Sequence, residues 1–236
     1  MFNDQIVHLF VSEGYENEVT ELINSIKFHD DRFFAKVKGS HSNAEKVFLY
    51  LQSSLYRSRK YIEGYVDAVN NNNIYMVALA VRAHLEAASS LGYLLKQIHG
   101  KDLNNDFPLD VINKLMLGTK DKSLLSDDIP NHDAVNVLTM IDAADSMISK
   151  FTGEKKTQVR KAYNILSEFC HPNGLGLAFA VDFTKDSMIF TESSSPLSIE
   201  QLYSFHKRLL FSADIFKGFY SEIGELLKAS IDLTKN

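Results

Sequence analysis

One segment, residues 74–98, constrains the fold of this chain more than any other. Nearly every residue from Ile74 to Leu95 is apolar or small, and the polar exceptions are Arg82, His84, Glu86, Ser89 and Ser90. A helix that is apolar on all sides has to be surrounded by other elements. The segment therefore predicts a buried central helix and a mainly α protein built around it.

Apolar residues also recur at helical spacing on either side of this segment. The expected helices cover residues 15–27, 44–69, 109–117, 133–150, 155–171 and a last long stretch from 198 toward 229. Ser198 and Gln201 form a capping box that starts the last helix. The four prolines all fall between these segments, which favours a single domain over 1–236 with an N-terminal helical extension over 1–43 and a core over 44–230.

The periodicity changes from helical to alternating after residue 176. Leu177, Phe179, Val181 and Phe183 alternate with small or polar residues. This pattern, followed by a turn pair and a second apolar run, predicts a small β-hairpin over 177–191, before the last helix.

Composition narrows the class of protein. The chain has 236 residues, a formal net charge of -5 and one cysteine, Cys170. The single thiol excludes an internal disulfide and a cysteine-only metal site, and the negative charge argues against binding nucleic acid by bulk charge. No apolar stretch reaches the roughly 18 uncharged residues that a membrane span needs, and the first five residues carry an acid where a signal peptide would carry basic charge. We expect a cytoplasmic protein without membrane association.

The predicted helix 155–171 carries a polar stripe. Asn164, Ser167, Glu168 and His171 lie three or four residues apart and share one face. A proline and an Asn-Gly pair follow, so His171 is expected at the helix C-terminus, where the last carbonyls favour its charged form. The imidazole is then suited to proton transfer or to holding a phosphate, or it caps the helix by bonding loose carbonyls.

Charged residues on the buried helix need partners. Arg82 and Glu86 lie one turn apart, and an unpaired buried charge costs several kcal/mol. We expect them either to face Glu168 and His171 in one polar pocket or to form a structural ion-pair network. By contrast, His29 lies in a polar stretch and is expected in solvent.

The metal and cofactor signals are weak. Glu168 and His171 match one Glu-x-x-His motif of di-iron bundles, but the second copy is missing. No phosphate loop, nucleophile elbow or zinc-helix signature occurs, so neither a metal nor a cofactor is expected.

Two basic clusters are candidates for phosphate contacts or are solvated helix faces. The first, flanked by tyrosines, comprises Arg57, Arg59 and Lys60, and the second comprises Lys155, Lys156, Arg160 and Lys161.

The run from Val81 to Glu86 and the run from Tyr163 to Asn173 together resemble bacterial helical proteins related to the HEPN superfamily, over roughly residues 44–230. The resemblance implies a helical bundle that is often a homodimer, and a metal-independent ribonuclease of toxin–antitoxin pairs or phage defence. That family uses an Arg-x4-6-His motif that meets its copy across the dimer. Here the histidine is matched by His171, but no arginine occupies the corresponding positions 164–166. Either Arg82 supplies the cation or only the fold is shared.

The leading hypothesis is an RNA-directed defence or toxin-type protein with metal-independent endoribonuclease activity. His171 would exchange protons, Arg82 would stabilise phosphate charge, and Glu86 and Glu168 would orient them. The candidate substrate-binding residues are Asn164, Ser167, Arg160 and Lys161. RNA, an antitoxin or other protein, and a second copy of the chain are the expected partners. The alternative is a non-catalytic interaction or ligand-sensing module whose polar pocket is structural.

Overall fold

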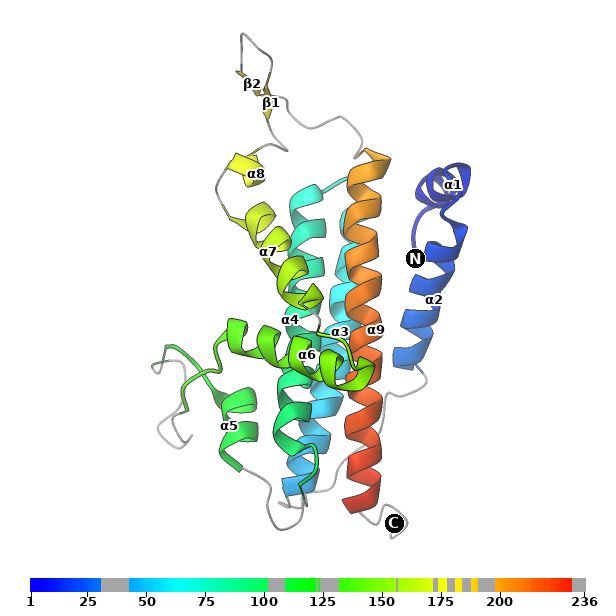
Figure 1. Ribbon diagram of the computed structural model, residues 1–236. Helices are drawn as coiled ribbons and strands as arrows, with labels where there is room; N and C mark the ends of the chain where they lie inside the picture. Colours follow the sequence, from blue (N-terminus) through cyan, green and yellow to red (C-terminus); the bar gives the residue numbers. More distant parts are fainter. Residues whose placement is uncertain are drawn as a thin grey trace. The chain divides into compact units, whose positions relative to one another are not determined.

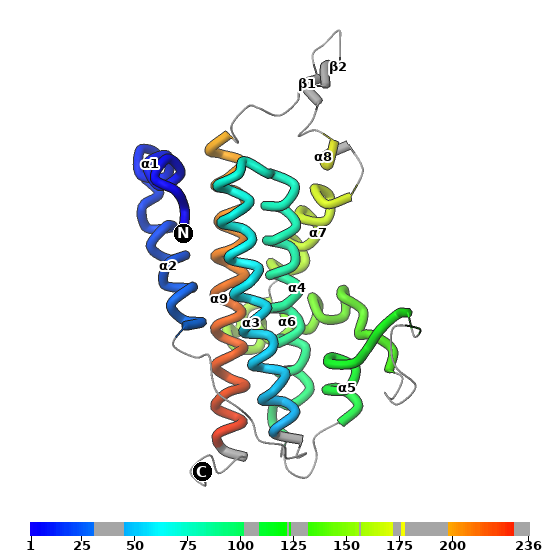
Figure 2. The backbone as a smooth tube through the Cα atoms, turned by 180° about the vertical axis from the view of Figure 1, so that it is seen from behind, coloured from blue at the N-terminus to red at the C-terminus, as the bar shows by residue number. Residues whose placement is uncertain are grey.

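The computed structural model describes residues 1–30, 43–101, 109–121, 123, 132–155, 157–171, 174–177, 181–183, 188–190 and 198–230. Its helices are α1 (Asp4–Ser12), α2 (Glu16–Asp30), α3 (Asn43–Asn70), α4 (Ile74–Ile98), α5 (Leu109–Leu117), α6 (Val137–Thr152), α7 (Gln158–Cys170), α8 (Gly174–Leu177) and α9 (Ile199–Ser230). Figure 1 labels them along the chain, and Figure 2 traces the same path from behind. The predicted mainly α fold is confirmed.

Local side-chain caps explain where several helices begin. The Asn3 side chain accepts a hydrogen bond from the N–H of Ile6 at the start of α1, and the Asn136 side chain accepts one from Leu138 at the start of α6. The Ser198 hydroxyl accepts the N–H of Gln201 at 3.2 Å, as the predicted capping box requires. Each contact satisfies a backbone donor that would otherwise lack a partner in the first turn.

The segment after α7 differs from its prediction at one end. Leu177, expected in a strand, is the last residue of the short helix α8. Strands β1 (Val181–Phe183) and β2 (Met188–Phe190) pair antiparallel, with Val181 opposite Phe190. The predicted turn at Lys185 and Asp186 lies outside the described residues.

The chain divides into two compact units, each assembled from three separate stretches. The first unit comprises residues 1–31, 58–85 and 161–214, and the second comprises 32–57, 86–160 and 215–236. Four of the five divisions fall within α3, α4, α7 and α9.

The first unit has an apolar core with aromatic residues around His206. Phe10, Tyr65 and His206 are almost completely buried, and the rings of Phe10 and His206 lie 5.0 Å apart. The His206 Nε2 faces the Glu18 carbonyl at 3.1 Å and so carries the hydrogen, which leaves Nδ1 to accept from the Tyr65 hydroxyl at 3.0 Å. Burial lowers the pKa of His206, so this ring serves the core as a neutral hydrogen-bonding group.

The second unit packs α4, α6 and α9 closely. Leu91, Leu94 and Ile141 are fully buried, and Phe216 of α9 joins them in the core. Gly92 lies where a Cβ atom would come within 2.8 Å of the Ala144 Cα and 2.7 Å of the Phe219 ring. The absence of a side chain at Gly92 therefore permits the approach of α4 to α6 and α9.

Within the described residues, the helices that are long enough to cross a membrane are not apolar enough to do so.

Candidate functional site

Helix α7 exposes the polar stripe that its sequence predicts. Tyr163 and Leu166 are buried, whereas Asn164, Glu168 and His171 are exposed. Ser167 is half-buried, and its hydroxyl has no hydrogen-bond partner among the described residues. One side of the helix thus packs into the protein and the other side remains available for contacts.

His171 lies directly after the last residue of α7. Its backbone N–H donates to the Ser167 carbonyl at 3.0 Å, which extends the helical hydrogen-bond pattern by one residue. The position at the helix C-terminus is therefore confirmed. The imidazole is exposed and makes no hydrogen bond to the described residues. Among these residues, no contact supports the alternative that the His171 side chain caps the helix.

Arg82 is held by Tyr163. Its Nη2 donates to the Tyr163 hydroxyl at 3.1 Å, and its guanidinium carbon lies 5.2 Å from the centre of the Tyr163 ring. This distance is within the range of a cation–π contact. The partner comes from the buried side of α7, since Tyr163 is 7% exposed.

The prediction that the helix carrying Arg82 is buried on all sides is wrong for its first turns. Tyr75, Met76 and Leu79 are 39%, 50% and 45% exposed, and Arg82 and Glu86 are half-buried. The apolar sequence of a helix does not show which sides of that helix the rest of the protein covers. Glu86 belongs to the second unit, whereas Arg82, Glu168 and His171 belong to the first.

Replacing Arg82 by alanine is expected to lower the free energy of unfolding by about 1–2 kcal/mol, because a charge-assisted hydrogen bond and a cation–π contact are lost together. Tyr163→Phe keeps the ring and should cost less, since only the hydroxyl contact disappears. Chemical denaturation of both variants measures the difference. Equal stability of Arg82→Ala and the parent would show that the Tyr163 contact contributes nothing.

The basic residue Arg160 has a structural partner at the start of α7. Its Nη2 lies 2.5 Å from a carboxylate oxygen of Asp142, and the same nitrogen reaches the Leu138 carbonyl at 3.3 Å. Beside it, the two oxygens of Asp145 accept the backbone N–H groups of Val159 and Arg160, both at 3.0 Å. Burial raises the pKa of Asp145. These contacts cap α7 from α6, while neighbouring Lys161 is exposed.

The other basic cluster also has acidic partners. Arg59 forms ion pairs with Asp30 at 2.6 Å and with Glu63 at 2.8 Å, and Lys60 pairs with Glu63 at 2.6 Å. The hydrogen bonds from Lys60 and Arg59 lower the pKa of Glu63. Part of the positive charge predicted for this surface is therefore balanced locally.

The most unusual polar arrangement was not predicted: a buried hydrogen-bonded chain in the first unit. His29 Nε2 lies 2.8 Å from the Ser58 hydroxyl, which lies 2.8 Å from His84 Nε2. His84 Nδ1 lies 2.5 Å from the Ser212 hydroxyl. These four side chains, from α2, α3, α4 and α9, are at most 1% exposed. We call them the buried histidine chain.

The expectation that His29 lies in solvent is wrong. Helix α2 continues three residues past its predicted end and carries His29 to a position that is 1% exposed. Burial, followed by the charge of His29, lowers the pKa of His84 to about 3. His84 was visible in the sequence as a polar residue on an apolar helix, but its partners were not.

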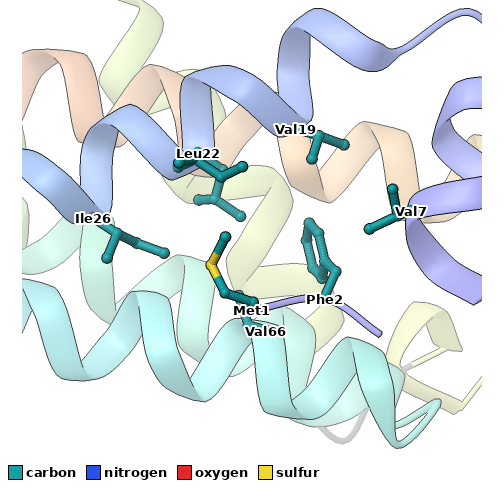
Figure 3. Close-up of a pocket in the computed structure, with 8 residues that line it drawn as sticks. Met1, Phe2, Val7, Val19, Leu22, Ile26 and Val66 are labelled. Carbon is teal, nitrogen blue, oxygen red and sulfur yellow. The ribbon is translucent and has the colours of Figure 1, made fainter. Parts of the chain in front are cut away.

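One hollow space among the described residues of the first unit is small and apolar. A cavity of about 50 Å³ lies beneath α2, lined by Val19, Leu22 and Ile26 together with Phe2 and Val66 (Figure 3). Apolar cavities of this kind stay dry, and this one is too small for a cofactor. Across the part of the chain that the structure describes, no three histidine, cysteine or acidic side chains gather as metal ligands.

Comparison with known proteins gives no relative: no family model, no curated protein and no solved structure matches the chain.

Proposed function

We propose that this protein acts on RNA through the exposed stripe of α7, with His171 as the proton-transfer group. The observation that carries the proposal is the exposure of His171, Glu168 and Asn164 on one side of a helix whose other side is buried. A polar stripe at a helix end is open to a large substrate. An imidazole is the side chain that most often transfers protons in enzymes.

The reaction would be metal-independent cleavage of the RNA backbone. His171 takes the proton of a 2′-hydroxyl as its oxygen forms a bond to phosphorus, and the bond from phosphorus to the 5′-oxygen breaks. The proton ends on that leaving oxygen, so no water is consumed in this step. Glu168, three residues before His171, lies on the same helical face and would orient the imidazole.

Positive charge for the phosphates would come from Lys161 and Arg82. Lys161 lies ten residues before His171, about 15 Å along the helix, and would bind the backbone away from the cleaved bond. Arg82 would stabilise charge from its place beside Tyr163. Following the resemblance to the HEPN superfamily, the protein would work in the cytoplasm as a homodimer with an antitoxin or another protein as partner.

His171→Ala is expected to abolish RNA cleavage and leave the melting temperature nearly unchanged, because the exposed side chain makes no hydrogen bond to the described residues. Purified protein is incubated with mixed RNA at low salt in a chelator, and products are separated on a gel. His8→Ala is the matched control, since His8 is an exposed histidine on α1 and should leave cleavage intact. A folded parent protein that neither binds nor cuts RNA at micromolar concentration would contradict the proposal.

The second candidate is a non-catalytic interaction or ligand-sensing module. It is favoured by the contacts of Arg82 with Tyr163 and of Arg160 with Asp142, because both cations already bind groups within the protein. In this case His171→Ala changes no RNA readout, and the stripe on α7 is a surface for a protein or small-molecule partner.

A further inference from the structure

The buried histidine chain ends on a backbone carbonyl at each side. His29 Nδ1 lies 2.6 Å from the Ser25 carbonyl, and the Ser212 hydroxyl lies 3.1 Å from the Leu209 carbonyl. A carbonyl only accepts hydrogen bonds. The groups between these two acceptors must therefore supply every hydrogen in the chain.

The number of hydrogens does not match the number of contacts. Five contacts link the two carbonyls through His29, Ser58, His84 and Ser212. With both imidazoles neutral, each of the four side chains carries one exchangeable hydrogen, so four hydrogens serve five contacts. One contact then lacks a hydrogen, and the longest one, from Ser212 to Leu209, is the natural position for it.

Placing the missing hydrogen at the 3.1 Å contact between Ser212 and Leu209 gives the neutral chain one direction. Ser212 donates to His84 Nδ1, His84 Nε2 donates to Ser58, Ser58 donates to His29 Nε2, and His29 Nδ1 donates to the Ser25 carbonyl. One additional hydrogen would complete all five contacts.

We propose that the buried histidine chain is a binding site for a single proton, shared between His29 and His84 through Ser58. With the proton on His84, that ring donates to both Ser212 and Ser58, and Ser212 turns its hydroxyl to the Leu209 carbonyl. Transfer to His29 moves the Nε2 proton of His84 to Ser58 while the hydroxyl hydrogen of Ser58 moves to His29 Nε2. Both positions keep every contact occupied, and charge and hydrogens balance.

Burial sets the pH at which this site fills. Removing an imidazolium from water disfavours the charged form, and burial accordingly lowers the pKa of His84 to about 3. The charge of one ring also opposes a second proton on the other, which limits the chain to one. His84 is therefore neutral near pH 7, and it takes up a proton only in acid.

Charged residues lie one or two positions in sequence from each member of the chain. Asp30 follows His29 and is paired with Arg59, which follows Ser58 and also binds Glu63. On α4, Arg82 lies two residues before His84, and on α9, Asp214 lies two residues after Ser212. The four members of the chain come from four helices of the first unit. This inference does not depend on the proposed action on RNA.

Nuclear magnetic resonance of protein labelled with ¹⁵N in histidine tests the proposal directly. At pH 8 we expect His29 with its hydrogen on Nδ1 and His84 with its hydrogen on Nε2. As the pH falls while circular dichroism reports a folded protein, both rings should change at one common midpoint, and their fractional changes should add to one proton. Two full protons, a full proton on one ring alone, or unfolding with both rings neutral would each overturn the proposal.

Two serine variants test whether the common midpoint depends on the hydrogen bonds of the buried histidine chain or only on the burial of its rings. Ser58→Ala removes the link, so the common midpoint should be replaced by separate behaviour of the two rings. Ser25→Ala is the matched control, because the Ser25 side chain is also buried but its hydroxyl has no hydrogen-bond partner among the described residues. It should keep the common midpoint. If Ser58→Ala does not fold, the titration of the parent protein decides the question.

Discussion

Lowering the pH from 6.5 to 5 is expected to reduce the free energy of unfolding by about 2 kcal/mol through His84 alone. The ring is fully buried, and its pKa in the folded protein is about 3, below the ordinary value of 6.5. The unfolded chain therefore takes up a proton in this range while the folded ring stays neutral. Stability is fully present above pH 6.5 and falls by about 1.4 kcal/mol per pH unit, to a total of about 5 kcal/mol near pH 3.

Carboxylates with lowered pKa values contribute little to the slope between pH 6.5 and 5, whereas Asp145, whose pKa burial raises, acts against the slope of the histidines. Glu63, Asp121 and Glu200 have lowered pKa values, so their contributions to stability are lost only at more acidic pH. His206, whose pKa burial also lowers, adds to the slope in the same direction as His84. Urea denaturation at several pH values measures the slope. A flat profile from pH 7 to 5 would contradict the expectation.

The helices could be predicted because their signals are local. The segments 74–98 and 109–117 coincide with α4 and α5, where apolar periodicity runs between clear turn residues. The polar stripe of α7 could also be predicted, since residues three and four apart share a face on any helix. Helix α1 and the last turn of α2 were missed because their sequences are short or polar.

The buried histidine chain could not be predicted because its contacts join residues far apart in the sequence. Ser58 and His84 are 26 residues apart, and His84 and Ser212 are 128 residues apart. A serine in a helix can be exposed to solvent or hydrogen-bonded to a buried partner. The sequence of its own helix does not identify the helix that supplies this partner. The same reason explains the contact of Arg82, whose partner Tyr163 is 81 residues away in the sequence.

Replacing Gly92 by leucine is expected to be the most disruptive single change in the second unit, lowering the free energy of unfolding by about 3 kcal/mol or more. A Cβ atom there would lie 2.8 Å from the Ala144 Cα and 2.7 Å from the Phe219 ring. The first is backbone and the second is part of a rigid, buried side chain, so neither yields easily. Even Gly92→Ala should destabilise by about 1–3 kcal/mol, although alanine is the better helix former.

Gly218 provides the control for this steric argument. It also lies inside a helix, α9, but a Cβ atom there would meet nothing within 4 Å. Gly218→Ala should therefore raise the free energy of unfolding by up to about 1 kcal/mol, because alanine restricts the unfolded chain and favours the helix. Denaturation curves should thus move in opposite directions for the two glycine-to-alanine changes. If both substitutions stabilise the protein, α4 does not approach α6 as closely as the structure indicates, and the packing assigned to Gly92 is wrong.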